Sequence, residues 1–452
     1  MNKTCIVFSF TLLSIVGFAQ QKQTYNLTLE ESINIALDSN YTAINARRDI
    51  AKAIKLKWET TAMGLPQINA EVSYQNNLKQ PVTLISSDLT GGEPGSFTPV
   101  IFGTKQSATA LATLTQLIFD GSYLVGLQAA KTFLDFSENA EEKTQLEVRK
   151  GVINAYGSVL LSKELVSIFE LNKKNLEKNL FETQKQYENG FTEEESVEQL
   201  EITLLNIETK LKNSQRTLLI AKQMFNLSLG LDIESKVSLK DSLDDLTQEN
   251  INLGFLDITI NIEENIDYKI AYNLTEQRSL ELKLEKSRAL PVLSAFLNYG
   301  TQAYSDSFTF LNSDKIWYQS SVLGLSMNIP IISSGMRSAR TQQARIAFDQ
   351  ATTELKETHQ KVQLQLSIAK SNYKFAIESY ENAKKNLVLT ERIEKKNQIK
   401  FVEGLATSFD LRLAQIQLYN AQQNYLQAML NVITTKAELE TVLNTPNFRN
   451  KE

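Results

Sequence analysis

The chain has 452 residues, a formal net charge of −5, and only one histidine and one cysteine. Basic and acidic residues are mixed along its length, which argues against a nucleic-acid-binding stripe or an acidic tail. The sequence contains no glycine-rich phosphate loop and no histidine-containing metal spacing. We therefore expect a protein that is not an enzyme and that uses no cofactor, no metal and no nucleic-acid partner.

The first nineteen residues predict a secretory signal peptide. Lys3 precedes an uncharged run, and the small residues Gly17 and Ala19 stand at positions −3 and −1 of a cut before Gln20. The apolar core is too short for a membrane-spanning helix, and the alternative is a buried N-terminal helix. Cleavage would remove Cys5, so the mature chain would have no thiol and no disulfide.

Residues from about 66 to 120 predict a pair of strands. Ile68, Ala70, Val72 and Tyr74 alternate with polar residues, and a similar alternation precedes residue 120. This period of two indicates strands with one apolar face and one polar face. Each run is close to the 9 to 11 residues that a tilted strand needs to cross a bilayer. The alternative is a soluble hairpin that caps a helical rod.

A long helical hairpin is predicted next. There is no proline between Pro99 and Pro291, and the intervening sequence is rich in helix-forming residues. We expect one arm to cover 121–189, a turn at Gly190, and a second helix with apolar residues every three or four positions. A helix of that size is on the order of 100 Å long, which a compact globule does not need. No mature segment reaches about 18 consecutive apolar residues, so no spanning helix is expected.

The second half repeats this pattern. Residues 290–299 match 65–74 position for position, a second alternating pair covers about 291–330, and a second arm covers 335–403 before Gly404. We therefore predict an internal duplication. The predicted parts are a signal peptide at 1–19, a first repeat at 20–230, an inter-repeat equatorial segment at 231–256, a second repeat at 257–445 and a tail at 446–452.

The alternation assigns individual side chains to the two faces of the strands. Aromatic residues flank the second pair, as at a membrane interface: Tyr299, Phe308, Phe310, Trp317 and Tyr318. The residues expected to face lipid are Ile68, Val72, Leu297, Leu323 and Leu325, and those expected to face a lumen are Asn69, Glu71, Thr113 and Asn298.

Four strands of this kind leave two open edges. Lipid offers no hydrogen-bonding partners for the exposed amides and carbonyls, so other copies of the chain must close the sheet. The second helix of the first hairpin also carries apolar residues away from its main seam, at Ile202, Leu205, Leu219 and Ile220. Strands and helices therefore both predict a ring of subunits.

The order of motifs along the chain resembles the TolC-like outer-membrane efflux proteins. In the first half, the resemblance covers residues 27–40 near the start of the mature chain, Leu65-Pro66, residues 117–121, and the tip glycine Gly190 with the helix after it. The second half repeats the same elements in the same order. It implies a homotrimer in the outer membrane, in which each chain gives four strands to one 12-stranded transmembrane barrel and its helices to a periplasmic coiled-coil cylinder. The fold class is thus mostly α with membrane β. Local departures from the family pattern occur at Tyr41, Ser122 and Ile266.

The same resemblance implies a transport function. The chain would be a passive exit channel of a tripartite efflux or type I secretion system, engaged by a periplasmic adaptor and an inner-membrane pump. The alternative is a periplasmic coiled-coil adaptor or scaffold without a barrel. Repeated membrane-length alternation favours the channel, because an adaptor has no use for it.

The resemblance also points to a gate at the hairpin tips. An acidic residue six positions after the second tip glycine is matched by Asp410, whereas the corresponding first-hairpin position is Ser196. An acidic ring at the first hairpin tip would therefore be formed by Glu194 or Glu195. Arg412 could compensate the charge of Asp410. Three positions before the second tip glycine, where the family can have a tyrosine, this chain has Phe401. Three residues have simpler expected roles: Gly190 and Gly404 would permit the turns, and His359 would lie on a solvated helix face.

Overall fold

The computed structural model describes residues 24–89, 91, 93 and 95–446, so the predicted signal peptide and residues 447–452 lie outside it. The chain forms two compact units, and each contains parts of both predicted repeats. Helices α2 (Tyr41–Ala62), α3 (Gly121–Glu188) and α7 (Met336–Val402) contribute residues to both. Unit 1 comprises Met1–Ala46, Glu141–Asn265 and Lys361–Glu452, and unit 2 comprises Arg47–Ala140 and Ile266–Gln360.

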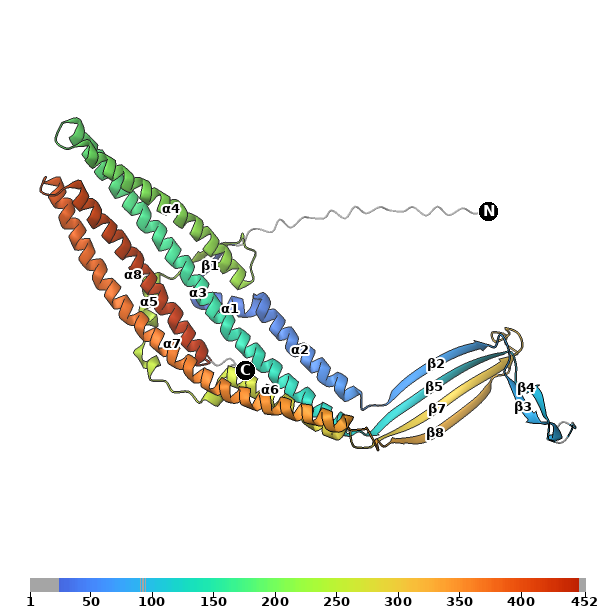
Figure 1. Cartoon of the computed structure of the whole chain (residues 1–452). Coiled ribbons are helices and arrows are strands. Elements are labelled where there is room, and N and C mark those ends of the chain that lie inside the picture. The colour runs from blue at the N-terminus through green and yellow to red at the C-terminus, as the bar shows by residue number, and fades with distance from the viewer. Residues whose placement is uncertain (1–23, 90, 92, 94, 447–452) are drawn as a thin grey trace, which may run out of the picture. The chain divides into compact units, whose positions relative to one another are not determined.

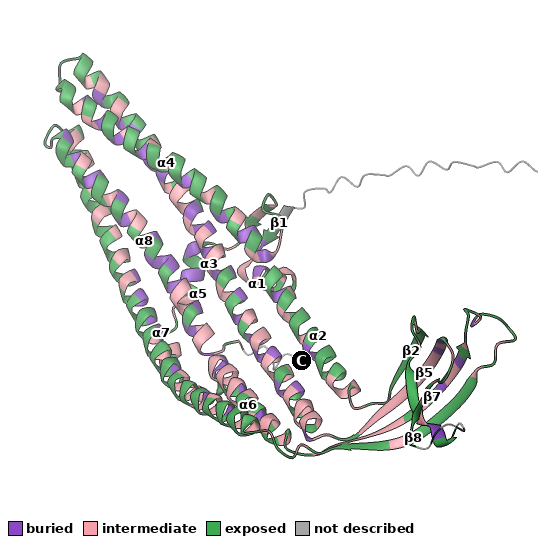
Figure 2. Ribbon diagram, turned by 45° about the vertical axis from the view of Figure 1, so that its right-hand side comes forward, coloured by how far each residue is buried: buried purple, intermediate pink, exposed green. Residues whose placement is uncertain are grey.

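Unit 2 contains a four-stranded antiparallel sheet with the order β2-β5-β7-β8 (Figure 1). Its strands are β2 (Gln67–Asn76), β5 (Gln106–Phe119), β7 (Val292–Ser305) and β8 (Tyr318–Asn328). The two central strands have 14 residues each, longer than the 9 to 11 expected from the sequence. Both edge strands are exposed along almost their whole length, as the green ribbons in Figure 2 show.

The connection between β2 and β5 is not a plain loop. It contains a hairpin of β3 (Val82–Ser86) and β4 (Phe97–Ile101), with the short helix η1 (Ser87–Leu89) between them. These strands are only five residues long, so their alternation is too short to stand out in the sequence.

The helices of unit 2 follow the same order as its strands. α2 packs against the first part of α3, α3 against α6 (Ile266–Ser287), and α6 against the first part of α7 (Figure 1). The contacts are Tyr123 Oη to Thr61 O (3.1 Å), Ser287 Oγ to Ser122 Oγ (3.5 Å) and Thr275 Oγ1 to Ala351 O (3.3 Å). His359 is half-buried, with its ring 6.1 Å from that of Tyr268. Tyr268, which is distant in sequence, thus partly covers the helix face that was predicted to be solvated at His359.

Unit 1 is built from the two helical hairpins. α3 pairs with α4 (Glu194–Leu229) and α7 with α8 (Ser408–Val442), and the helix ends agree with the predicted arms to within a residue or two. Buried residues recur along all four helices (Figure 2), and buried apolar residues from both hairpins form one core cluster. Tyr156, Phe225 and Tyr373 are completely buried there, which fits apolar seams repeating every three and four residues.

Short elements complete unit 1. They are β1 (Thr24–Leu27), α1 (Leu29–Ser39), β6 (Lys236–Leu239), α5 (Leu243–Asn250), η2 (Leu253–Leu256) and η3 (Ile262–Glu264). β1 and β6 pair in parallel, and Thr28 with Glu31 forms a capping box at the start of α1. The predicted equatorial segment 231–256 thus contains β6, α5 and η2.

One helix has membrane-compatible hydropathy. An 18-residue window of α3 reaches a mean hydropathy of 1.3, although 44% of that window is buried. The sequence prediction considered only uninterrupted apolar runs and therefore missed this window. Because nearly half of it is buried, we attribute its hydropathy to packing against neighbouring helices.

Candidate channel surfaces and gate

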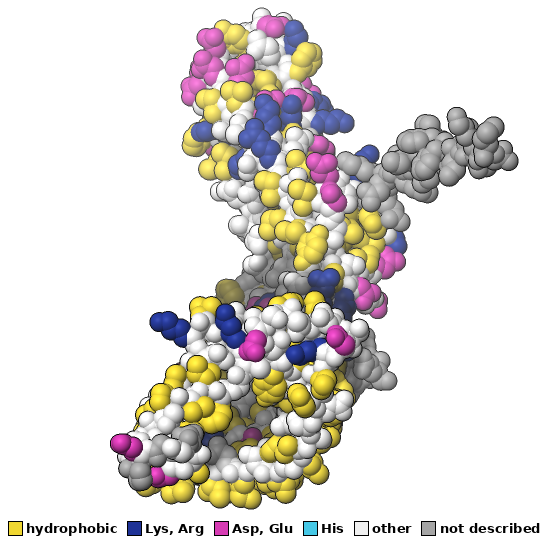
Figure 3. Space-filling view, turned by 90° about the vertical axis from the view of Figure 1, so that its right-hand side faces the viewer, with side chains coloured by type: hydrophobic (Ala, Val, Ile, Leu, Met, Phe, Trp, Pro, Cys, Tyr) yellow, Lys and Arg dark blue, Asp and Glu magenta, His cyan; other side chains and the backbone are white. Residues whose placement is uncertain are grey.

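The strand register places the predicted lipid-facing residues on one face of the sheet. Ile68, Leu114, Leu297 and Leu323 form a single row across the four strands. Ile68 and Leu323 are 71% and 78% exposed, so neither packs against a core in the single chain. Figure 3 shows hydrophobic side chains gathered along the outer side of the curved sheet. An uncovered apolar surface of this kind calls for lipid or another apolar partner.

The opposite face of the sheet is mainly polar. Asn69, Thr113 and Asn298 form one row with Val322, and the row that contains Glu71 lies next to it on the same face. An apolar exception on this face is Phe296, whose ring lies where a side chain at Gly324 would have to be. Glycine at position 324 thus leaves room for the aromatic ring. The two faces differ in polarity, as alternation predicted.

Aromatic residues cluster at the end of the sheet near the β7–β8 connection. The ring of Tyr74 lies 5.5 Å from that of Phe308 and 5.8 Å from that of Phe310. Phe310 is buried over Ala108 and Ala303, next to Trp317. Three of these aromatic residues were singled out in the sequence. The participation of Tyr74 was missed, because it belongs to the other strand pair.

Both hairpin tips use the same turn. Gly190 has φ +75° and Gly404 has φ +70°, a left-handed conformation that glycine adopts at little cost. At the first tip, Phe191 N donates to Gln186 O at 2.8 Å, and at the second Leu405 N donates to Lys400 O at 2.7 Å. These are the hydrogen bonds of a Schellman motif, which closes a helix C-terminus.

The structure gives Asp410 a local role that the sequence reasoning missed. Its carboxylate accepts hydrogen bonds from Thr407 N (3.0 Å) and Thr407 Oγ1 (2.7 Å), and its own N donates to Thr407 Oγ1 at 3.2 Å. This is a capping box at the start of α8. The hydrogen bonds from Thr407 lower the pKa of Asp410. Asp410 is nevertheless exposed, so its charge remains available to ions.

Arg412 does not form an ion pair with Asp410 among the described contacts. Its guanidinium lies over the ring of Phe409, 5.2 Å from the ring centre, and its Nε is buried without a hydrogen-bond acceptor. Compensation of Asp410 by Arg412 therefore stays a prediction. A cation–π contact of this kind instead fixes Arg412 beside the first turn of α8.

Gln199 connects the two tips. Its Nε2 donates to Glu195 Oε1 at 2.8 Å, while its Oε1 accepts from Ser408 Oγ at 3.3 Å. The predicted gate residue Glu195 is thus linked to the start of α8 through a single side chain, whereas Glu194 is exposed beside it. No feature of the sequence identified Gln199 or Ser408, because the two residues belong to different hairpins.

A groove of about 460 Å³ lies near the tips, between α3 and α7. Phe401 is half-buried in its wall together with Asn179, Thr183 and Val402. Farther along, Phe169, Leu176, Leu200 and Tyr419 form a cluster that joins the first hairpin to α8. Burial raises the pKa of the Tyr419 hydroxyl, and it also raises the pKa of Glu394.

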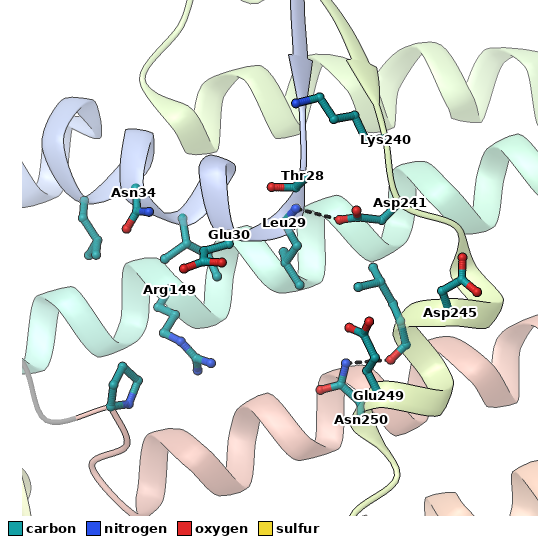
Figure 4. A pocket seen from close by; sticks show the side chains of 14 residues that line it. Thr28, Leu29, Glu30, Asn34, Arg149, Lys240, Asp241, Asp245, Glu249 and Asn250 are labelled. Atoms are coloured by element: carbon teal, nitrogen blue, oxygen red, sulfur yellow. Dashed lines mark hydrogen bonds between the residues drawn. The ribbon is translucent and has the colours of Figure 1, made fainter.

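A second pocket, of about 650 Å³, lies among α1, α3 and α5 (Figure 4). Asp241 accepts hydrogen bonds from Leu29 N (2.7 Å) and Tyr156 Oη (2.9 Å) at its edge. Tyr156 Oη also contacts Leu27 O at 3.1 Å. Tyr373 acts similarly on α7, with its hydroxyl donating to Asn250 O at 2.6 Å. Tyr156 of α3 and Tyr373 of α7 therefore both bind the segment between the two repeats, at Asp241 and Asn250.

Within the described residues, no group of three or more histidine, cysteine, aspartate or glutamate side chains could hold a metal ion. The candidate functional features of the described residues are the two faces of the sheet and the hairpin tips.

Comparison with known proteins shows which proteins the chain is similar to. Residues 273–445 match the model of the outer membrane efflux protein family. The chain is 22% identical to the outer membrane protein TolC of Escherichia coli over 462 aligned positions, which cover 96% of this chain and 85% of TolC. It is 21% identical to TolC of Salmonella enteritidis with the same coverage.

Solved structures show the same fold. The outer membrane protein VceC of Vibrio cholerae is 15% identical, with a TM-score of 0.71 and coverage of 92% of this chain and 96% of VceC. The Campylobacter jejuni CmeC outer membrane channel is also 15% identical, with a TM-score of 0.73 and coverage of 92% and 85%. The open state of the Neisseria gonorrhoeae MtrE outer membrane channel gives a TM-score of 0.69 at 16% identity, with coverage of 92% and 88%. The chain is therefore similar over nearly its whole length to TolC-like outer membrane efflux proteins, and its residues 273–445 match the model of that family.

Proposed function

We propose that three copies of the chain form the outer-membrane exit channel of a tripartite efflux system, each giving four strands to a 12-stranded barrel. The observation that carries this proposal is the four-stranded sheet with an apolar outer face and two unpaired edges, β2 and β8. In lipid, each unpaired backbone group costs several kcal/mol, so a sheet of this kind is stable there only when closed. Pairing of β8 with β2 of the next copy closes it.

The helices support a ring as well. α4 and α7 both expose apolar side chains away from the seams that hold the hairpins together. Burial of such side chains against a second copy is favourable by about 25 cal/mol for each Å² of apolar surface removed from water. The exposed residues are Ile202, Leu205, Leu219 and Ile220 on α4, and Leu364, Ile368, Phe375 and Leu389 on α7.

In this assembly the channel is passive. Substrate would be delivered by an inner-membrane pump and a periplasmic adaptor, and the chain itself would supply only the path. The proteins it resembles are channels, which fits a protein without enzymatic activity. The predicted repeats at 20–230 and 257–445 would then give the trimer an approximate sixfold symmetry.

The gate is proposed to lie at the hairpin tips. Threefold symmetry would bring three copies of Asp410, Glu194 and Glu195 around one axis. The link from Glu195 through Gln199 to Ser408 supports this, because it ties the acidic turn of α4 to the capped start of α8. A shift of one hairpin would have to break that link, and an adaptor that binds the shifted arrangement better would favour opening.

The alternative is a periplasmic adaptor or scaffold, and it is not favoured. The apolar face of the sheet extends over strands of 10 to 14 residues. Strands of that length can cross a membrane, whereas a soluble adaptor would expose the same face to water.

The proposal predicts a conducting pore. Purified full-length protein added to a planar lipid bilayer should give discrete steps of ion current. The pore should be more permeable to cations than to anions because of the acidic residues at the tips. A heat-unfolded sample of the same preparation serves as the control. Failure of the folded protein to conduct under any voltage would contradict the channel function.

A further inference from the structure

Glu71 differs from every other residue of the four-stranded sheet. It is the only charged side chain in β2, β5, β7 and β8. It stands on the polar face, in a row with Leu111, Gly300 and Ser320, and it is exposed. None of the ion pairs found in the described part of the chain includes Glu71. Within the described residues, therefore, the carboxylate of Glu71 has no ion-pair partner.

The surroundings of Glu71 leave its carboxylate accessible. The neighbours on the same strand face are Asn69 and Ser73, which are small and uncharged. Across the sheet, Gly300 carries no side chain, and a Cβ there would lie 3.2 Å from Leu111 Cδ1. A carboxylate on the lipid side of a barrel would be unfavourable, so its position also agrees with a water-filled inner face.

From this arrangement we infer that Glu71 forms a second cation-selective ring, inside the barrel, and that the channel favours substrates with cationic groups over polyanions. The inference rests on the proposed trimeric barrel. Twelve strands about 4.8 Å apart and tilted by about 40° close into a cylinder on the order of 24 Å across. Three inward carboxylates would then lie within roughly 15 Å of one another, with no other charge on the strands.

Ionic strength decides when this ring acts. At 0.1 M salt the screening length is about 10 Å, similar to the distance from each carboxylate to the centre of the lumen, so the field of the ring is reduced there. At 0.01 M it is about 30 Å, so the fields of the three carboxylates overlap across the lumen. The effect of Glu71 on selectivity should therefore be larger at low salt than at 0.1 M.

The test isolates this ring from the tips. In a background with Asp410→Asn, Glu194→Gln and Glu195→Gln, the reversal potential in a salt gradient near 0.01 M should still indicate a cation preference. Adding Glu71→Gln should lower the cation-to-anion permeability ratio by about two- to threefold, an order-of-magnitude expectation for overlapping fields at this ionic strength. Glu71→Lys should reverse the preference. The control Ser73→Gln, on the same face, should leave it unchanged.

Thiol labelling provides a second readout, since Cys5 lies in the predicted signal peptide and the mature chain would contain no other cysteine. In the same background, the channel with Glu71→Cys should have no cation preference. Labelling with a thiosulfonate reagent that carries a sulfonate should restore the cation preference, and labelling with one that carries an ammonium group should produce an anion preference. The matched variant Val72→Cys, on the opposite face, should not respond.

The outcomes separate this inference from the proposed function. A conducting channel whose selectivity is the same with the native Glu71, with Glu71→Gln and with Glu71→Lys would overturn the inference and leave the channel intact. Absence of any conducting channel from the parent protein would instead contradict the proposed function.

Discussion

Leu297→Arg should prevent or strongly impair assembly, whereas Asn298→Arg should be tolerated. Leu297 lies in a row with Leu114 and Leu323 on the apolar face, and Asn298 is on the opposite face. Arginine on the lipid side near the midplane of a barrel costs about 2 to 4 kcal/mol per site, while a lumen position leaves the charge in water. Because a trimer would contain three such sites, the difference between the two variants should be large.

The measurement is the free energy of unfolding of protein refolded into lipid vesicles, followed with urea. The two variants form a matched pair, since they introduce the same side chain at adjacent positions. Equal stability of the two would show that the face assignment is wrong. Loss of stability only in Asn298→Arg would mean that the faces are inverted.

Neutralising the tip carboxylates should lower cation selectivity and cation block without preventing assembly. The variant combines Asp410→Asn, Glu194→Gln and Glu195→Gln, with Asp410→Asn expected to have the largest single effect. Asparagine retains an oxygen that can accept from Thr407 N, so the cap of α8 is preserved while the charge is removed. A ring of like charges attracts cations, and its removal weakens that attraction.

This effect should depend on pH in a defined direction. The hydrogen bonds from Thr407 lower the pKa of Asp410, so the carboxylate stays charged to a lower pH than an ordinary aspartate. The contribution of Asp410 should be present at neutral pH and be lost as the pH falls through its lowered pKa. Repulsion within a ring of three carboxylates acts in the opposite direction. Single-channel recordings test this, and unchanged selectivity and block in the triple variant would exclude these residues from the constriction.

Local sequence patterns predicted the parts of the fold that depend on local rules. The alternation around Ile68 and Leu297 identified strands and also their faces, because a strand places successive side chains on opposite sides. Gly190 and Gly404 identified the tips, since a positive φ is easily adopted only by glycine. The helix seams followed from apolar spacing in the same way.

The remaining features depend on residues that are far apart in the sequence. Gln199 bonds Ser408 across two hairpins, and Tyr156 bonds Asp241 in the connecting segment. Neither pair leaves a periodic signal. The capping role of Asp410 could have been predicted, because a threonine followed three residues later by an acidic residue is typical of a capping box at a helix N-terminus. The sequence analysis considered Asp410 only as a gate residue.

The central claim is that three copies close one barrel in the outer membrane. The most direct measurement is the mass of the complex extracted from isolated outer membranes in mild detergent, determined by native mass spectrometry after the detergent is removed. We expect a complex of three mature chains in the outer-membrane fraction. A monomer, or a complex found only in the soluble periplasm, would contradict it.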